Sequence, residues 1–591
     1  MDLGTLVDGT LHDTLTVSLP LFRTELALAA TVVLLLLCRM LPSLPKPLAG
    51  LAALAAAGGV FLATPGGLTD PARLGVAAAV AVGCLAASVV RLDSGLVTLG
   101  GAAFAAWYAW TDLQGLPGGP LAAAGSTTPG QQELFGGLIV FDSLTAYVRL
   151  VLAGFLCLYA VFTEASGIPD REDGADFYAL VTGATLGMCL MASAHHLLMV
   201  FMAVEMASVP SYALAGLLKG RKASSEAALK YAVYGAGAAG VMLYGISLLA
   251  GLLGTCHLPT LATEMARLVG QGGDSGSLMV LVLGGLMVAV GLAFKLSAVP
   301  FHFWCPDVFE GAAAEVGGFL SVASKAAAVA LLVRFTFALG SPAAAGDDAV
   351  AAAGLVGVRH FMVVVIGMMA AVTCTLGNLA AYGQTNMKRL LAYSTIAHAG
   401  YLMMGAAAAV ALLGSSAEGA SRAVAAIAFY LGTYLFMNLA AFAIVALLRN
   451  RLRSEQITAY SGLVRSSPGI VVAAAVVLVS LVGLPPLAGF VSKFLIFSSL
   501  VDAITAGAER PLMLVLLVVG GLNTVISLFY YLRVLKVMTF DPPPADRAGE
   551  AFPLVSLPGA VVTGLALPVV VLGVFWSGLY SAAQLAGRMP L

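Results

Sequence analysis

Residues 291–312 read GLAFKLSAVPFHFWCPDVFEGA, in which Lys295 interrupts a long apolar run. A charge inside a membrane-spanning helix costs about 2.5–3.5 kcal/mol on insertion scales, so by default it indicates a function. Pro300 follows in the same run and removes a backbone donor, which opens the helix. Irregular backbone at membrane depth is tolerated only where protein or water surrounds it. We therefore predict a broken transmembrane helix that carries a functional lysine.

A second stretch, much further along the chain, repeats this combination. Residues 483–494 read GLPPLAGFVSKF, where two adjacent prolines precede Lys493. Inverted-repeat transporters use this arrangement, with a discontinuous helix in each half of the chain and an ion site near the midplane. The two stretches together favour a transporter-like fold built from two related halves.

The composition agrees with a membrane protein. Of 591 residues, 60% are hydrophobic and only 10% are charged, whereas a soluble chain carries about a quarter charged residues. The formal net charge of −1 provides no basic surface for nucleic acid. The seven cysteines are far apart and form no C-x-x-C pair, so we predict no metal ligands and no iron–sulfur cluster.

Apolar runs long enough to cross a bilayer recur along the whole chain, since a spanning helix needs about 20 largely apolar residues. We predict an all-α polytopic protein of about 16 helices, near 19–41, 46–65, 73–91, 94–111, 138–163, 177–194, 196–218, 228–254, 277–300, 317–339, 360–383, 391–414, 422–448, 468–500, 512–538 and 554–585. Residues 112–137 contain several Pro and Gly and are predicted to form an irregular loop.

Basic residues gather in loops that fall on one side of the membrane in this arrangement. Lys and Arg collect at 219–222, 388–389, 449–465 and 533–547, whereas an opposite loop such as 340–359 carries few. By the positive-inside tendency, the basic side is cytoplasmic and both termini lie outside.

Three more ionisable residues stand out inside predicted spans, namely Glu205, Lys230 and Lys325. Lys230 follows a basic loop, so it is either a functional residue or a lysine that extends to the interface. Lys325 is either a functional residue or one partner of a buried structural ion pair.

Lysine chemistry suggests what these residues do. Burial disfavours the charged ammonium and a nearby carboxylate favours it, so a buried lysine with a mobile carboxylate partner is a switchable proton carrier. Glu205 is the candidate partner. His302 and His398 are possible proton relays, because histidine titrates near neutral pH; for each, a structural role is about equally compatible with the sequence.

At these residues the chain resembles the N subunit of NADH-quinone oxidoreductase (respiratory complex I), the counterpart of mitochondrial subunit 2. The stretch at 291–312 carries the resemblance, and further family-like segments follow in order over 140–540. They lie at 177–214, 224–236, 319–334, 377–402, 483–494 and 526–538.

The resemblance implies a fold and a set of roles. It implies a 14-helix antiporter-like core with two inverted repeats and broken helices, plus about two extra N-terminal helices. The proton-translocating unit is expected at 138–540, after N-terminal transmembrane helices and an external loop at 1–137 and before a loop and last helix at 541–591. Glu205 would modulate a lysine, Lys295 would be the central pumping residue and Lys325 the connecting one. Lys493 would end the half-channel, and Lys230 would flank the row.

The resemblance also implies what this chain lacks and what surrounds it. No cofactor is expected here; FMN, iron–sulfur clusters and quinone would be bound by other subunits, and redox chemistry there would drive proton movement. Expected partners are an antiporter-like M subunit, small K- and J-type subunits and the bilayer of a bacterial inner membrane. The FHFWCPDVFEG form and Lys493 favour the N subunit over its L and M relatives.

One departure from the family pattern is a segment that reads AAAEVGGF where the family usually has two prolines, and it introduces Glu315. Two alternatives remain open at this point. If the chain is not an N subunit, the first alternative is a subunit of a related cation/proton antiporter or membrane-bound hydrogenase. The second alternative is a structural membrane subunit whose lysines only anchor its neighbours.

Overall fold

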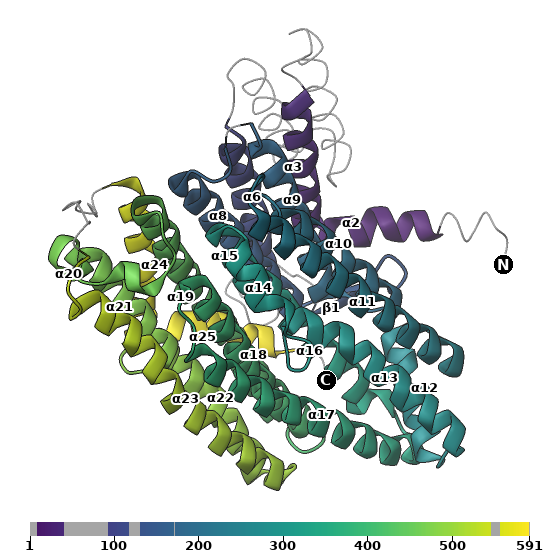
Figure 1. The fold of residues 1–591 in the computed structure, drawn as a ribbon. Coiled ribbons are helices and arrows are strands. Elements are labelled where there is room, and N and C mark those ends of the chain that lie inside the picture. Colours follow the sequence, from purple (N-terminus) through teal and green to yellow (C-terminus); the bar gives the residue numbers. More distant parts are fainter. Residues whose placement is uncertain (1–8, 41–92, 117–129, 171, 545–555, 590–591) are drawn as a thin grey trace.

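The computed structural model describes residues 9–40, 93–116, 130–170, 172–544 and 556–589 (Figure 1). Within these ranges, 12 helices are long and apolar enough to cross a membrane. The number is 13 if Gly9–Leu21 and Arg23–Arg39, which meet at 84°, form one span. The all-α polytopic prediction is confirmed. The predicted helices at 46–65 and 73–91 lie outside the described residues.

The N-terminal part of the molecule is a group of helices around the start of the predicted core. Its elements are α2 (Leu19–Leu21), α3 (Arg23–Met40), α6 (Ser94–Gly115), α8 (Ser143–Ser166), α9 (Gly174–Ser193), α10 (Leu197–Ala215), α11 (Lys222–Leu253) and α12 (Leu258–Gly270). The predicted helix at 94–111 is present as α6, although its composition does not place it among the 12 candidate spans.

Three segments form the centre of the protein. In the most apolar 18 residues of each segment, the buried share is 100% for Ala314–Gly340, 94% for α18 (Met387–Leu412) and 89% for α19 (Ala417–Leu452). In contrast, the peripheral span α23 (Arg510–Thr539) is 28% buried. Figure 1 shows the central helices between the purple and blue N-terminal helices and the yellow-green C-terminal ones. Four further helices are α17 (Ala349–Ala381), α20 (Leu463–Ser466), α24 (Leu557–Val574) and α25 (Ser577–Gly587). Other helices lie on either side of the two helix breaks.

The first predicted helix break is present. Helix α13 (Ser275–Leu296) ends at Ser297, whose φ of 55° leaves the helical region, and the chain resumes as α14 (Trp304–Gly311). The indole nitrogen of Trp304 donates to the carbonyl of Phe294 at 3.1 Å, and the same oxygen accepts from the N–H of Ser297 at 3.0 Å. This side chain therefore joins the two sides of the break.

The second predicted break is also present, and it divides the predicted span at 468–500 into two helices. Helix α21 (Pro468–Val482) stops at Gly483, which has φ 91°, and α22 (Ala488–Thr505) begins after the two prolines. A side chain at Gly489 would collide with the carbonyl oxygen of Ser480, so only glycine permits this approach of the two helices. The prolines interrupt the hydrogen-bond ladder that one continuous helix needs.

The central segment Ala314–Gly340 is also irregular. A π-helical turn, η3 (Leu320–Ser324), separates α15 (Ala314–Phe319) from α16 (Lys325–Gly340). A π-turn accommodates one extra residue within an α-helix and is frequent at functional sites. Lys325 follows this wider turn directly.

A short hairpin corrects the boundary between the predicted loop at 112–137 and the predicted span at 138–163. Strand β1 (Gln131–Leu134) pairs antiparallel with β2 (Ile139–Asp142), so α8 begins only at Ser143. Asp142 caps this helix by accepting a hydrogen bond from the backbone N–H of Thr145 at 2.9 Å.

Candidate functional site

Lys295 lies in the last turn of α13 and is 1% exposed. Its Nζ donates a hydrogen bond to Oγ of Ser208 on α10 at 2.8 Å. The Ser208 hydroxyl donates in turn to the carbonyl of Val204, so its oxygen is available as an acceptor. A buried ammonium is thus held by a neutral hydroxyl and not by a carboxylate.

Glu205, the predicted partner of Lys295, lies on the same helix as Ser208 and is partly exposed. The opposite charges of Glu205 and Lys295 act on each other, yet among the described residues Glu205 forms no ion pair. The structure therefore shows no direct ion pair between the predicted partners, and the modulating role of Glu205 stays a prediction.

Lys230 on α11 is paired on the rim of the core. Its Nζ lies 2.8 Å from Oδ2 of Asp307 on α14 and 2.8 Å from Oε1 of Glu226, one turn earlier on its own helix. Asp307 also accepts from Arg389 at 2.8 Å. Asp307 belongs to the PDVFEG end of the opening stretch, so this ion pair joins the broken-helix segment to α11 and α18.

Lys325 is 2% exposed and donates to the backbone carbonyl of Thr395 on α18 at 3.2 Å. No carboxylate among the described residues pairs with Lys325, so the structure gives no support to a buried structural ion pair. Thr395 Oγ1 lies 2.9 Å from Ser321 Oγ, which lies 3.3 Å from the hydroxyl of Tyr434. A row of hydroxyl groups, from Thr395 through Ser321 to Tyr434, therefore lies beside Lys325, although within the described ranges its ammonium bonds only to the Thr395 carbonyl.

His398 lies beside this row, one turn after Thr395 on α18, and contacts it through the ring of Tyr434. Its ring centroid is 5.1 Å from that of Tyr434, and its Nδ1 lies 2.7 Å from the hydroxyl of Tyr430. The side chain is 2% exposed. The charges of Lys325 and Lys493 both act on His398, so the histidine lies within electrostatic reach of both lysines.

Lys493 on α22 is 3% exposed and donates to the carbonyl of Val482 at 2.8 Å. Val482 is the last residue of α21, and its carbonyl is free because the helix ends there. The ammonium also lies 4.3 Å from the centroid of the Tyr401 ring, a cation–π contact. The second helix break thus supplies both an acceptor and space for the lysine.

His302 is not joined to these residues. It lies in the break between α13 and α14, and its buried Nδ1 has no hydrogen-bond partner in the described part of the chain. Its role as a relay stays a prediction.

Three residues that contact the lysines or lie beside them were not predicted from the sequence, because they carry no formal charge. They are Ser208, Ser321 and Tyr434. A signal exists in the STIAHAGY segment, where Thr395 and His398 are three residues apart and therefore share one helix face.

Glu315, the unexpected acid in the altered segment, has a buried partner. Its two carboxylate oxygens each lie 3.0 Å from a guanidinium nitrogen of Arg449 on α19. Lys388 lies nearby with Glu455 at 2.9 Å and donates to the carbonyl of Ala312. In this chain, an ion-pair network holds the turn before α15.

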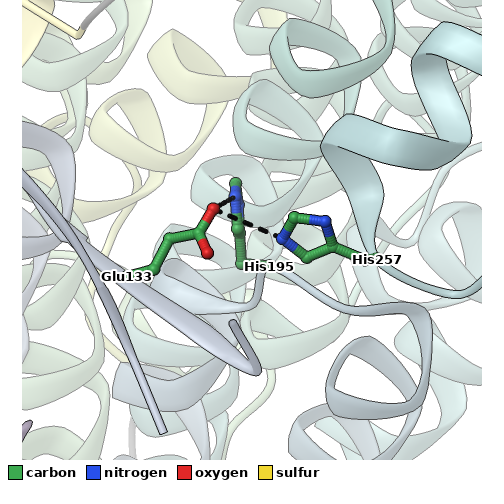
Figure 2. Close-up of side chains that lie close together, drawn as sticks. All are labelled: Glu133, His195 and His257. Atoms are coloured by element: carbon green, nitrogen blue, oxygen red, sulfur yellow. Dashed lines mark ion pairs between the residues drawn. The ribbon is translucent and has the colours of Figure 1, made fainter. Parts of the chain in front are cut away.

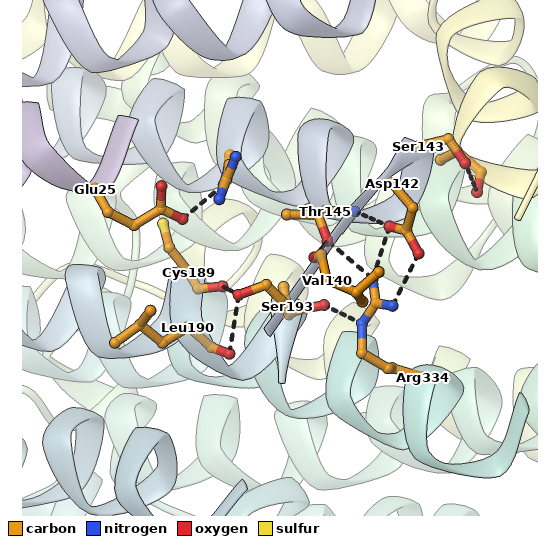
Figure 3. Close-up of polar contacts among 12 residues, drawn as sticks. Glu25, Val140, Asp142, Ser143, Thr145, Cys189, Leu190, Ser193 and Arg334 are labelled. Atoms are coloured by element: carbon orange, nitrogen blue, oxygen red, sulfur yellow. Dashed lines mark hydrogen bonds and ion pairs between the residues drawn. The ribbon is translucent and has the colours of Figure 1, made fainter. Parts of the chain in front are cut away.

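A second buried ion pair links the hairpin to α16. Both terminal nitrogens of Arg334 point at Asp142, at 2.7 and 2.8 Å (Figure 3). Burial raises the pKa of Asp142, but the charge of Arg334 and the hydrogen bonds from Arg334 and Thr145 outweigh it and hold that pKa below its ordinary value. The same figure shows Glu25, whose carboxylate pairs with Arg149 at 2.6 Å.

Comparison with known proteins agrees with this geometry. A family model described as "NADH:quinone oxidoreductase/Mrp antiporter, TM" matches residues 194–522. The chain is 42% identical to NADH-quinone oxidoreductase subunit N 2 of Sorangium cellulosum, over 77% of this chain and 85% of the relative. It is 39% identical to subunit N of an Anaeromyxobacter species, over 76% and 84%.

Solved structures show the same fold. Respiratory complex I of Thermus thermophilus with bound aureothin contains a chain 29% identical to this one, with a TM-score of 0.59, and the match covers 82% of this chain and 93% of that one. A chain of the Mrp complex of a Dietzia species has a TM-score of 0.64 at 18% identity, over 95% and 97%, which is a likeness of fold alone.

Broken helices around buried lysines, in a protein with at least 12 candidate spans, define an antiporter-like membrane subunit. Within that class the identity to curated relatives is specific. The chain belongs to the family of subunit N of NADH-quinone oxidoreductase.

Proposed function

We propose that this chain carries protons across the membrane within an NADH-quinone oxidoreductase, along a row formed by Glu205, Lys295, Lys325, His398 and Lys493. The observation that carries the proposal is that all three central lysines are at most 3% exposed and lack an acidic partner among the described residues. A buried ammonium without a counter-ion is costly to keep charged. Each such lysine is therefore suited to releasing and regaining a proton.

The contacts of the row support this role. Lys295 is held by a hydroxyl, Lys325 by the backbone carbonyl of Thr395, and Lys493 by a carbonyl at a helix break. The hydroxyl of Thr395 lies in the row beside Lys325. Hydroxyl and imidazole groups both donate and accept protons, whereas a carboxylate partner would fix the ammonium form. A purely structural lysine is expected to have such a partner, as Lys388 has with Glu455.

The proposal extends to the complex and to orientation. NADH oxidation, FMN, iron–sulfur clusters and quinone are assigned to other subunits, and this chain is a subunit of a proton-translocating enzyme with its antiporter-like unit at 138–540. It would contact an M subunit and small K- and J-type subunits in a bacterial inner membrane. The basic loops after α10, α17, α19 and α23 would face the cytoplasm, and both termini would lie outside.

The experiment uses the assembled complex in sealed vesicles. Lys295→Ala is expected to abolish most NADH-driven proton uptake while the complex still assembles, because no other group replaces the carrier. Lys219→Ala is the matched control, since Lys219 has a side chain 78% exposed and pairs with Asp173. Normal pumping by an intact Lys295→Ala complex would refute the proposal.

A further inference from the structure

Three side chains outside the lysine row converge on one point. Glu133 comes from β1, His195 from the connection between α9 and α10, and His257 from the residue before α12 (Figure 2). Their ligand atoms all lie within 4.8 Å of one another. We propose that Glu133, His195 and His257 bind a divalent transition-metal ion, with zinc as the best match to their chemistry.

The distances fit a shared metal. Oε1 of Glu133 lies 3.4 Å from Nε2 of His195 and 3.3 Å from Nε2 of His257. Zinc binds imidazole nitrogen and carboxylate oxygen at about 2.0–2.2 Å in a tetrahedral arrangement, which separates neighbouring donor atoms by about 3.3–3.5 Å. Calcium and magnesium prefer oxygen ligands alone. Two imidazoles and one carboxylate therefore select a zinc-like ion.

The hydrogen bonds of the cluster favour a metal over a simple ion pair. His257 Nε2 is buried and has no hydrogen-bond partner in the described part of the chain, although the Glu133 carboxylate is so close. The other ring nitrogen of His257 lies 3.0 Å from the hydroxyl of Thr260. If that nitrogen donates its proton to Thr260, Nε2 presents a lone pair toward Glu133. Such outer partners commonly orient histidines that bind metals.

The backbone holds the ligands in place before any ion binds. The N–H of His195 donates to the carbonyl of Leu138 at 3.0 Å, and the carbonyl of His195 accepts from the N–H of Leu258 at 3.0 Å. His196 and His257 form an isolated antiparallel bridge. Glu133 faces Val140 across the hairpin. Three connections that are distant in sequence are thus paired at the backbone level.

The absence of a side chain at Gly137 leaves space for the ion. This glycine has φ 84°, and a side chain there would lie 3.2 Å from Nε2 of His257 and 3.3 Å from Oε2 of Glu133. The carboxylate side chain of Glu133 is 49% exposed, so an ion can enter from solvent and keep a water as its fourth ligand. A bound ion would tether the hairpin to the ends of α9 and α11, on the membrane side opposite the basic loops.

The test measures zinc in the purified complex that contains this chain. The complex is treated with a chelator, equilibrated with limiting Zn²⁺, freed of excess ion and analysed for metal content. The wild type is expected to hold one more zinc per complex than Glu133→Gln or His257→Ala. His360→Ala is the matched control, because His360 is 61% exposed and pairs only with Glu509 among the described residues.

Thermal unfolding gives an independent readout. Zn²⁺ is expected to raise the melting temperature of the wild type and of His360→Ala but not of the two ligand variants, since an ion that binds only the folded state stabilises it. Glu133→Gln alters a half-exposed side chain, so a folded protein remains for measurement if His257→Ala fails to fold. Equal zinc content in the wild type and Glu133→Gln would overturn the proposal and leave a plain ion-pair cluster. This outcome would not affect the proton-carrying role.

Discussion

Glu315 and Arg449 form a two-pronged ion pair in the protein interior, with both oxygen–nitrogen distances at 3.0 Å. The pair joins α15 to α19, two of the most buried elements. Its geometry matches the flat fork of guanidinium to the carboxylate, which makes it one of the stronger kinds of hydrogen-bonded pair.

Glu315→Gln should destabilise the protein by about 3–5 kcal/mol, because it leaves the buried guanidinium of Arg449 without a counter-charge. Glu418→Gln is the control. It breaks an ion pair with Arg422 in which Glu418 is 85% exposed, and such a surface pair is worth about 0–1 kcal/mol. Thermal unfolding of the purified complexes measures both. Equal, small shifts in melting temperature for the two variants would show that the buried pair stabilises the protein no more than the surface pair does.

Asp307→Asn should weaken proton pumping by about tenfold, because Lys230 loses its ion pair with Asp307. A tenfold effect corresponds to about 1.4 kcal/mol of lost interaction. The substitution removes the carboxylate that Lys230 and Arg389 share. Glu310→Gln is the matched control, because Glu310 pairs with Arg389 and leaves Lys230 untouched. The readout is vesicle acidification per NADH oxidised. If Glu310→Gln has the same effect as Asp307→Asn, the Lys230 contact is not the cause.

Thr395→Val should reduce pumping with little change in folding. Valine has the shape of threonine, but it lacks the hydroxyl that bonds to Ser321 beside Lys325. Thr336→Val serves as the comparison, since that buried hydroxyl bonds only to carbonyls of its own helix. The ratio of pumping to NADH oxidation distinguishes them. Full coupling in Thr395→Val would exclude its hydroxyl from the proton row.

The Asp142–Arg334 pair predicts a specific pH dependence of stability. The folded-state pKa of Asp142 is held below its ordinary value, so the pair stabilises the fold above the unfolded pKa of about 3.9 and loses this contribution as pH falls through the folded value. The stability difference between wild type and Asp142→Asn should stay constant from neutral pH to about pH 4. It should shrink only below that. Denaturant unfolding at several pH values checks this, and a difference that already declines near pH 6 would contradict it.

The sequence predicted the parts of the fold that depend on hydropathy and on charge in an apolar setting. Lys295, Lys325 and Lys493 stood out because a charge among apolar neighbours is expensive wherever the helix sits. The breaks beside Lys295 and Lys493 were predictable because proline cannot continue a helix ladder. The residues that connect the lysines were not, because Ser321 and Tyr434 carry no charge and meet Thr395 only through tertiary packing.

Boundaries failed for a different reason. The ends of the break inside 468–500 were not located, since hydropathy averages over residues and Val482 and Ala488 are apolar on both sides of it. The strand β2 was read as helix because Ile139, Val140 and Phe141 are as apolar as a spanning segment. The zinc-type cluster was missed because its three ligands lie in connections that only the folded chain brings together.

The π-turn before Lys325 means that the direction of this side chain depends on the number of residues before it. The turn already absorbs one extra residue, so removing one residue from Leu320–Ser324 would let it close into ordinary α-helix with α16 in nearly its present orientation. Removing a second residue would exceed what the turn absorbs, and the remainder of the central helix would rotate by about 100° relative to α15. Lys325 would then point away from the Thr395 carbonyl, and Arg334 away from Asp142. A two-residue deletion that hydropathy does not register would therefore disconnect both the proposed proton row and the hairpin.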